Sequence, residues 1–175
     1  CTNNRRLRKK TDVKEYSTQL NTINIDEYAL KLKAILKDPV RSELYKDRIN
    51  LFQKIIDKCE FASKDIEITH FFGFRFIARD EFNSKISLNA LSSGEKHMII
   101  QLYELLFEAQ DGTLVLIDEP ELSLHMMWQM NYLKFLEEIS KLRGYQCIVA
   151  THSPQIFNSM WSLTTDLFTI SNSER

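Results

Sequence analysis

Glycine is scarce in this sequence, with four residues in 175. They are Gly73, Gly94, Gly112 and Gly144, and none belongs to a Gly-x-x-x-x-Gly-Lys-Ser/Thr pattern. A loop of that pattern cradles nucleotide phosphates with its backbone N–H groups. The 175 residues therefore do not contain a complete nucleotide site of that type.

Cysteine is equally sparse, and long apolar runs are absent. Cys1, Cys59 and Cys147 are isolated. An odd number without metal-ligand spacing favours a reduced, cytoplasmic protein over a disulfide framework. No apolar run approaches the roughly 20 residues that span a bilayer, and the start of the chain shows no signal-peptide pattern. We therefore expect no membrane partner.

The charges nearly cancel, to a formal net charge of -1, which excludes a strongly basic nucleic-acid binder on composition. The one local exception is the run Arg-Arg-Leu-Arg-Lys-Lys at residues 5–10. It reads either as a solvated terminus or as an arm that contacts phosphates. Because the chain starts with Cys and a polar stretch, we expect it to be a piece of a longer protein.

The chain divides into three parts by composition and period. Residues 1–25 are polar without a clean period and predict a linker or tail. Residues 26–60 predict two amphipathic helices, over 27–37 and 41–59, separated by Asp38-Pro39, and together they form a helical insertion or lid. Residues 61–175 carry the remaining elements.

This third part alternates strands and helices. Residues 65–89 predict a β-hairpin or two to three short antiparallel strands. A helix over 95–110 is apolar nearly all round and is expected to be buried. Apolar strands at 114–117 and 147–150 flank a helix over 126–143, which is a βαβ unit, and 167–170 is a candidate closing strand. Since neither apolar strand alternates, we expect both of their faces to be covered. The fold class is α/β.

Ser92, Ser93, Gly94 and Glu95 precede the buried helix. Ser followed three residues later by Glu is a capping box. A helix N-terminus also offers free N–H groups and a positive dipole end to an anion. The block can therefore cap its helix and bind a phosphate at the same time.

Polar residues follow both apolar strands. Asp118 and Glu119 end the first, and His152 follows the second, at the sheet edge where open α/β sheets bind ligands. If the strand persists, the two carboxylates point to opposite faces, one toward Mg²⁺ and the other toward a water molecule. A solvated turn is the alternative. A zinc site of Asp118, Glu119, His125 and His152 lacks the tight spacing of metalloenzyme motifs.

The order and spacing of these blocks resemble the C-terminal half of an ABC-type ATPase domain, over about residues 85–157. Leu-Ser-Ser-Gly-Glu, then four apolar residues with Asp-Glu-Pro, then Thr-His-Ser-Pro are separated by 23 residues (Glu95 to Asp118) and 33 residues (Glu119 to His152). The resemblance implies a P-loop NTPase head without its Walker A lobe. The string Asp-Glu-Pro-Glu-Leu-Ser-Leu-His is similar to bacterial ATPases of the overcoming-lysogenization-defect (OLD) type. These are cousins of SMC-like and RecF-like ATPases and of Septu- and retron-associated defence ATPases.

By that resemblance, Ser92–Glu95 form the signature motif, which contacts ATP bound to a partner subunit. Asp118 binds Mg²⁺ directly or through water, Glu119 is the general base, and His152 is the switch histidine. His125 stands in the D-loop, near nucleotide, where transporter domains usually have aspartate.

The function implied is ATP binding and hydrolysis by heads that dimerise around nucleotide, in a DNA-associated or anti-phage defence ATPase. The cofactors are ATP and Mg²⁺, and the partners are a second copy, a nuclease or other effector subunit, and DNA. The isolated chain is expected to be inactive. The alternatives are the nucleotide-binding subunit of an ABC transporter and a catalytically silent scaffold.

Overall fold

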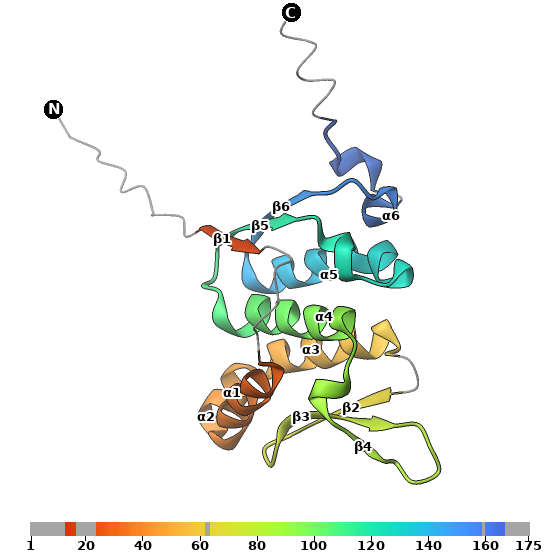
Figure 1. Cartoon of the computed structure of the whole chain (residues 1–175). Coiled ribbons are helices and arrows are strands. Elements are labelled where there is room, and N and C mark those ends of the chain that lie inside the picture. The colour runs from red at the N-terminus through yellow and green to blue at the C-terminus, as the bar shows by residue number, and fades with distance from the viewer. Residues whose placement is uncertain (1–12, 17–23, 62–63, 159, 167–175) are drawn as a thin grey trace, which may run out of the picture.

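The structure is a computed structural model, and it describes residues 13–16, 24–61, 64–158 and 160–166. These residues form stacked layers (Figure 1). A parallel sheet lies at one side, helices α4 and α5 follow beneath it, helices α1 to α3 come next, and a small antiparallel sheet lies at the opposite side. The basic run at 5–10 and the candidate strand at 167–170 fall outside the described residues.

The parallel sheet has the order β1-β5-β6. Its strands are β1 (Val13–Tyr16), β5 (Leu114–Asp118) and β6 (Gln146–Ala150). Helix α5 (Met126–Arg143) joins β5 to β6, which confirms the predicted βαβ unit. Strand β1 pairs in parallel with β5 through the register Val13↔Leu114. The polar composition of residues 1–25 predicted only a linker, so this strand was not foreseen.

One face of the parallel sheet is left uncovered by the described residues, so the predicted cover of both faces is found here for one face only. Val115 and Ile117 are buried against the helices, whereas Leu114 and Leu116 are half-buried. On the neighbouring strand Ile148 is 59% exposed. Figure 1 shows α4 and α5 on one side of the sheet only. Both faces of these strands are thus apolar, but α4 and α5 bury only one of them.

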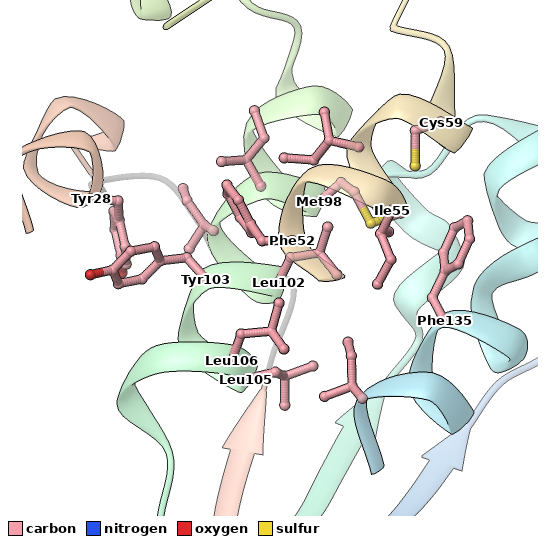
Figure 2. Packing of buried hydrophobic residues seen from close by; sticks show 14 of the residues in the cluster. Tyr28, Phe52, Ile55, Cys59, Met98, Leu102, Tyr103, Leu105, Leu106 and Phe135 are labelled. Atoms are coloured by element: carbon pink, nitrogen blue, oxygen red, sulfur yellow. The ribbon is translucent and has the colours of Figure 1, made fainter. Parts of the chain in front are cut away.

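Helix α4 (Ser93–Tyr103) is the centre of the core. Every residue from His97 to Tyr103 is buried, as the all-round apolar pattern predicted. Figure 2 shows side chains from α1, α3 and α5, among them Phe52, Ile55 and Phe135, gathered around this helix. The rings of Tyr28 and Tyr103 meet edge to face, with centroids 5.1 Å apart. The helical layer of residues 26–60 therefore shares one core with the parallel sheet.

The buried helix does not end as an ordinary α-helix. It continues as a π-helix over Glu104–Glu108, whose last carbonyls need donors. Arg143, at the end of α5 and only 3% exposed, donates to the carbonyls of Leu105, Leu106 and Ala109. The Tyr145 hydroxyl donates to the Leu105 carbonyl as well, at 2.8 Å. One guanidinium group thus joins the ends of the two central helices.

The helical layer consists of α1 (Ile25–Lys37), α2 (Pro39–Leu44) and α3 (Lys46–Cys59). The predicted single helix over 41–59 is interrupted at Tyr45, which leaves helical geometry at φ -97° and ψ 6° and stacks on Phe107. No helix among the described residues is long and apolar enough to cross a bilayer.

The predicted antiparallel strands are confirmed as β2 (Lys64–Thr69), β3 (Gly73–Ala78) and β4 (Lys85–Ile86), in the order β2-β3-β4. Gly73 has φ +82°, and a Cβ there would lie 1.8 Å from the Ala29 carbonyl oxygen. Only glycine therefore permits this contact of β3 with α1. Short segments complete the described chain: η1 (Leu88–Ala90), η3 (Pro120–Ser123), α6 (Pro154–Phe157) and η4 (Trp161–Leu163).

Replacing Arg143 with Ala is expected to destabilise the protein by about 2–4 kcal/mol, because three buried carbonyls each lose a charged donor and Asp111 loses an ion pair. Arg143→Lys recovers only part of this loss, since one ammonium group cannot reach all three carbonyls. Lys141→Ala, which breaks an exposed pair with Glu137, should cost less than about 0.5 kcal/mol. Urea unfolding of the three variants measures the difference, and equal effects of Arg143→Ala and Lys141→Ala would contradict this role.

Candidate functional site

The capping box at the start of α4 is present as predicted. The Ser92 hydroxyl accepts from the Glu95 N–H at 3.2 Å, and the Glu95 carboxylate accepts from the Ser92 N–H at 2.8 Å. Ser92 and Ser93 are exposed, whereas Gly94 is buried. As the first residues of the helix, Ser93 and Gly94 have no intrahelical acceptor for their N–H groups. These donors remain available to an anion at the helix N-terminus.

Glu95 has a supporting position beneath this helix end. Its second carboxylate oxygen lies 2.6 Å from the Lys64 ammonium of β2, and its side chain is 6% exposed. Burial acts to raise the pKa of the Glu95 carboxyl, but hydrogen bonds from Lys64 and the Ser92 backbone outweigh it and lower that pKa. Both oxygens are therefore occupied by protein donors. Glu95 fixes the helix end, and the N–H groups of Ser93 and Gly94 are the donors left for an anion.

The two carboxylates after β5 differ in geometry. Strand β5 ends at Asp118, which is exposed. Glu119 adopts the left-handed conformation, with φ 45° and ψ 54°, and its N–H donates to the Ala150 carbonyl at 2.8 Å. The expectation of opposite faces on a continuing strand is thus corrected, because the chain turns at Glu119. A left-handed conformation in a residue other than glycine is strained and is found often at functional sites.

His152 lies beside this turn. Its imidazole Nε2 is 3.9 Å from a carboxylate oxygen of Glu119, and its side chain is 92% exposed. The parallel register Asp118↔Ala150 brings the two strand ends together. The structure therefore places Glu119 and His152 next to each other although they are 33 residues apart in sequence.

His125 has a structural role in this arrangement. It is the N-cap of α5, and its Nδ1 accepts from the Met127 N–H at 3.4 Å. Glu121, two residues after Glu119, is a functional candidate that the sequence did not single out. Its carboxylate accepts hydrogen bonds from both Thr151 and His152. A lone glutamate after proline has no recognisable spacing, so no sequence signal singled it out.

All these groups lie toward one end of the molecule. Figure 1 shows the start of α4 and the carboxyl ends of β5 and β6 at the same side of the layers. Among the described residues, no group of three or more His, Cys, Asp and Glu side chains is arranged to hold a metal ion by itself. The arrangement instead offers one exposed carboxylate, one carboxylate beside an imidazole, and a helix N-terminus, which is suited to chemistry on a phosphate.

This combination of fold and strand-end residues is that of an α/β ATPase domain of the AAA/ABC type. Residues 6–158 match the family model described as "AAA domain, putative AbiEii toxin, Type IV TA system". The chain belongs to that family.

Two curated relatives support the same class. The chain is 29% identical over 149 residues to "Retron Ec83 probable ATPase" of Escherichia coli, an alignment that covers 73% of this chain and 27% of the relative. It is 31% identical over 106 residues to an uncharacterized ABC transporter ATP-binding protein of Methanocaldococcus jannaschii, covering 61% and 40% respectively. The chain thus spans less than half of either relative.

Among solved structures, the fold is similar to a chain in "Crystal structure of the SmcHead bound to the C-winged helix domain of ScpA". The TM-score is 0.52 at 18% identity, and the match covers 79% of this chain and 46% of that one. At this identity the likeness concerns the fold alone. The P-loop ATPase architecture expected from the sequence is confirmed.

Protonation of His97 on α4 is expected to make stability depend on pH. His97 is 5% exposed, and burial lowers its pKa below 6.5. Among the described side chains, its Nδ1 is a buried atom without a hydrogen-bond partner. As pH falls below about 6.5, the unfolded chain binds a proton that the folded chain does not, so stability falls until the lowered pKa is passed.

The slope from this one group is at most about 1.4 kcal/mol per pH unit. Urea unfolding at several pH values between 7.5 and 5 measures it, and His97→Leu serves as the comparison because it lacks the titrating group. We expect a shallower pH dependence in His97→Leu. Identical slopes would show that His97 does not carry the effect.

Proposed function

We propose that this chain forms the part of an ATP-hydrolysing head that supplies the signature motif, the Mg²⁺-binding carboxylate and the general base. Two copies would hold ATP between them, each using Ser92, Ser93 and Gly94 on the nucleotide of the other. The observation that carries the proposal is the placement of Glu119 and His152, 3.9 Å apart, at the end of two paired parallel strands. A general base and a polarising group are needed together to activate water.

The residues present fit ATP and Mg²⁺. Mg²⁺ prefers hard oxygen ligands with several waters retained, and Asp118 offers an exposed carboxylate at the strand end. The N–H groups of Ser93 and Gly94 suit phosphate oxygens. When bound, Mg²⁺ neutralises charge that develops on the transferred phosphoryl group.

The chain's own residues would activate the attacking water and stabilise the transition state. Glu119 accepts a proton from the attacking water, and its turn at φ 45° directs the carboxylate out of the strand. His152 holds that water or a phosphate oxygen, since its imidazole projects into solvent beside Glu119. The helix N-terminus at Ser92 stabilises negative charge in the transition state with groups already oriented.

A phosphate-binding glycine loop has to come from outside these 175 residues. The uncovered face of the β1-β5-β6 sheet, where Ile148 is 59% exposed, supports packing of the lobe that carries this loop against the sheet. Cover by such a lobe would complete both faces of strands whose sequence is apolar throughout.

The biological setting we infer is a defence ATPase, and the similarity to a retron ATPase supports it. The partners we propose with it are an effector subunit such as a nuclease, and DNA. A role as the nucleotide-binding subunit of a transporter is the second candidate, and the name of the archaeal relative favours it. His125, in place of the usual transporter aspartate, argues for the defence ATPase.

Glu119→Gln in the full-length protein is expected to retain ATP binding and to lose at least about 100-fold in turnover, because the amide cannot accept the proton. Glu137→Gln is the matched control, since Glu137 is exposed on α5 and pairs with Lys141, away from the strand ends. Steady-state phosphate release and nucleotide binding measure the two effects. Unchanged turnover in Glu119→Gln would refute the assignment of the base, and a wild-type protein that binds no ATP would favour the silent scaffold.

Ser93→Glu is expected to abolish ATP-driven dimerisation and leave the fold intact. The new carboxylate lies where a partner's phosphate would bind and repels it, yet a negative charge in the first helical turn is favourable to the helix itself. Ser93→Ala is the control without charge. Light scattering with ATP, in a Glu119→Gln background that prevents turnover, reports the dimer. Normal dimerisation of Ser93→Glu would show that this helix end faces no nucleotide.

A further inference from the structure

We propose that Glu121 is a positioning residue that holds the His152 loop against the Glu119 turn. Its carboxylate accepts from the Thr151 hydroxyl at 2.7 Å with one oxygen and from the His152 N–H at 2.9 Å with the other. These two donors follow β6, whereas Glu121 lies in η3, which follows β5. One side chain thus joins the two loops that carry the proposed chemistry, and the inference rests on the proposed function.

The two hydrogen bonds from Thr151 and His152 to Glu121, which we call the Glu121 clamp, are supported by further hydrogen bonds on both sides. Thr151 uses its hydroxyl oxygen to accept from the Ser153 N–H at 3.0 Å, which fixes the turn around His152. Gln129 of α5 donates to the backbone carbonyls of Glu121, at 3.3 Å, and Leu124, at 2.9 Å. The Ser153 hydroxyl lies 2.9 Å from the Gln129 amide oxygen. The network therefore closes through η3, α5 and the loop after β6.

His152 depends on this network because its side chain has little else to hold it. The imidazole is 92% exposed, and a carboxylate oxygen of Glu119 lies 3.9 Å from its Nε2. The position of the ring is therefore set by the backbone at His152, whose N–H is bound by Glu121. A displacement of about 1 Å in a positioned group can cost ~100-fold in rate.

Glu121 is not a second candidate for the base. Both of its oxygens accept from donors of the loop after β6, which holds the carboxylate against that loop. A positioning role and a proton-transfer role make different demands on the side chain. Positioning needs one acceptor for the His152 N–H and one polar partner for the Thr151 hydroxyl, whereas proton transfer needs a carboxylate.

The test is steady-state ATP hydrolysis by the full-length protein with Glu121→Ala and Glu121→Gln. Glu121→Ala is expected to lower kcat by about 10- to 100-fold and to change the KM for ATP less than about threefold, since ATP contacts are untouched. Glu121→Gln is expected within about threefold of wild type, because its amide oxygen can accept from His152 while its NH₂ donates to the Thr151 hydroxyl.

Thr151→Val, which has nearly the same shape but no hydroxyl, removes the bonds of Thr151 to Glu121 and to the Ser153 N–H. It leaves the bond from the His152 N–H to Glu121, so it should give an intermediate loss. Amide hydrogen exchange offers a readout that is independent of activity: the His152 N–H should exchange faster in Glu121→Ala and not in Glu121→Gln. Glu137→Ala is the control for an exposed glutamate on α5.

Wild-type kcat and unchanged His152 exchange in Glu121→Ala would overturn the inference. A Glu121→Gln variant as impaired as Glu121→Ala would also overturn it, because the charge rather than the positioning would then matter. Both results leave the proposed function standing if Glu119→Gln still abolishes turnover. If Glu119→Gln hydrolyses ATP normally, the proposed function fails. The hydrogen-exchange rate of the His152 N–H in Glu121→Ala still shows whether Glu121 holds the His152 backbone.

Discussion

The structure depends on the burial of α4 on all of its sides. A helix with apolar residues all round is stable only if every face is covered and both ends find hydrogen-bond partners. Here the parallel sheet and α5 cover one side, and α1 and α3 cover the other. The capping box of Ser92 and Glu95 closes the start of the helix, and Arg143 donates to the carbonyls at the far end. The same burial fixes the direction of the helix, so its N-terminus comes to the end of the molecule where β5 and β6 finish.

Local patterns were sufficient to predict the elements that carry their own signal. The helix predicted over 126–143 is present and ends at Gly144 in a left-handed conformation, and the Ser-x-x-Glu box at 92–95 is formed. The parallel βαβ unit followed from two short apolar strands around one helix. Each of these depends on neighbours in sequence, and this is why spacing alone reveals them.

The features that were missed depend on contacts distant in sequence. Strand β1 is four residues in polar surroundings, and only its pairing with Leu114 to Ile117 makes it a strand. The uncovered face of the sheet could not be inferred from the sequence. An apolar strand indicates that both of its faces become buried, but it does not indicate which segment buries each face. The left-handed turn at Glu119 and the Glu121 clamp arise from the docking of one strand end on the next. The candidate site was therefore predictable in its members, such as Asp118, Glu119 and His152, and not in the groups that orient them.

The central claim is that the chain holds two half-sites that serve different nucleotides. A structure of the full-length protein with a non-hydrolysable ATP analogue and Mg²⁺ tests it most directly. The account predicts that each nucleotide contacts Asp118, Glu119 and His152 of one subunit and Ser92, Ser93 and Gly94 of the other. A nucleotide that contacts both sets in the same subunit, or neither set, would contradict it.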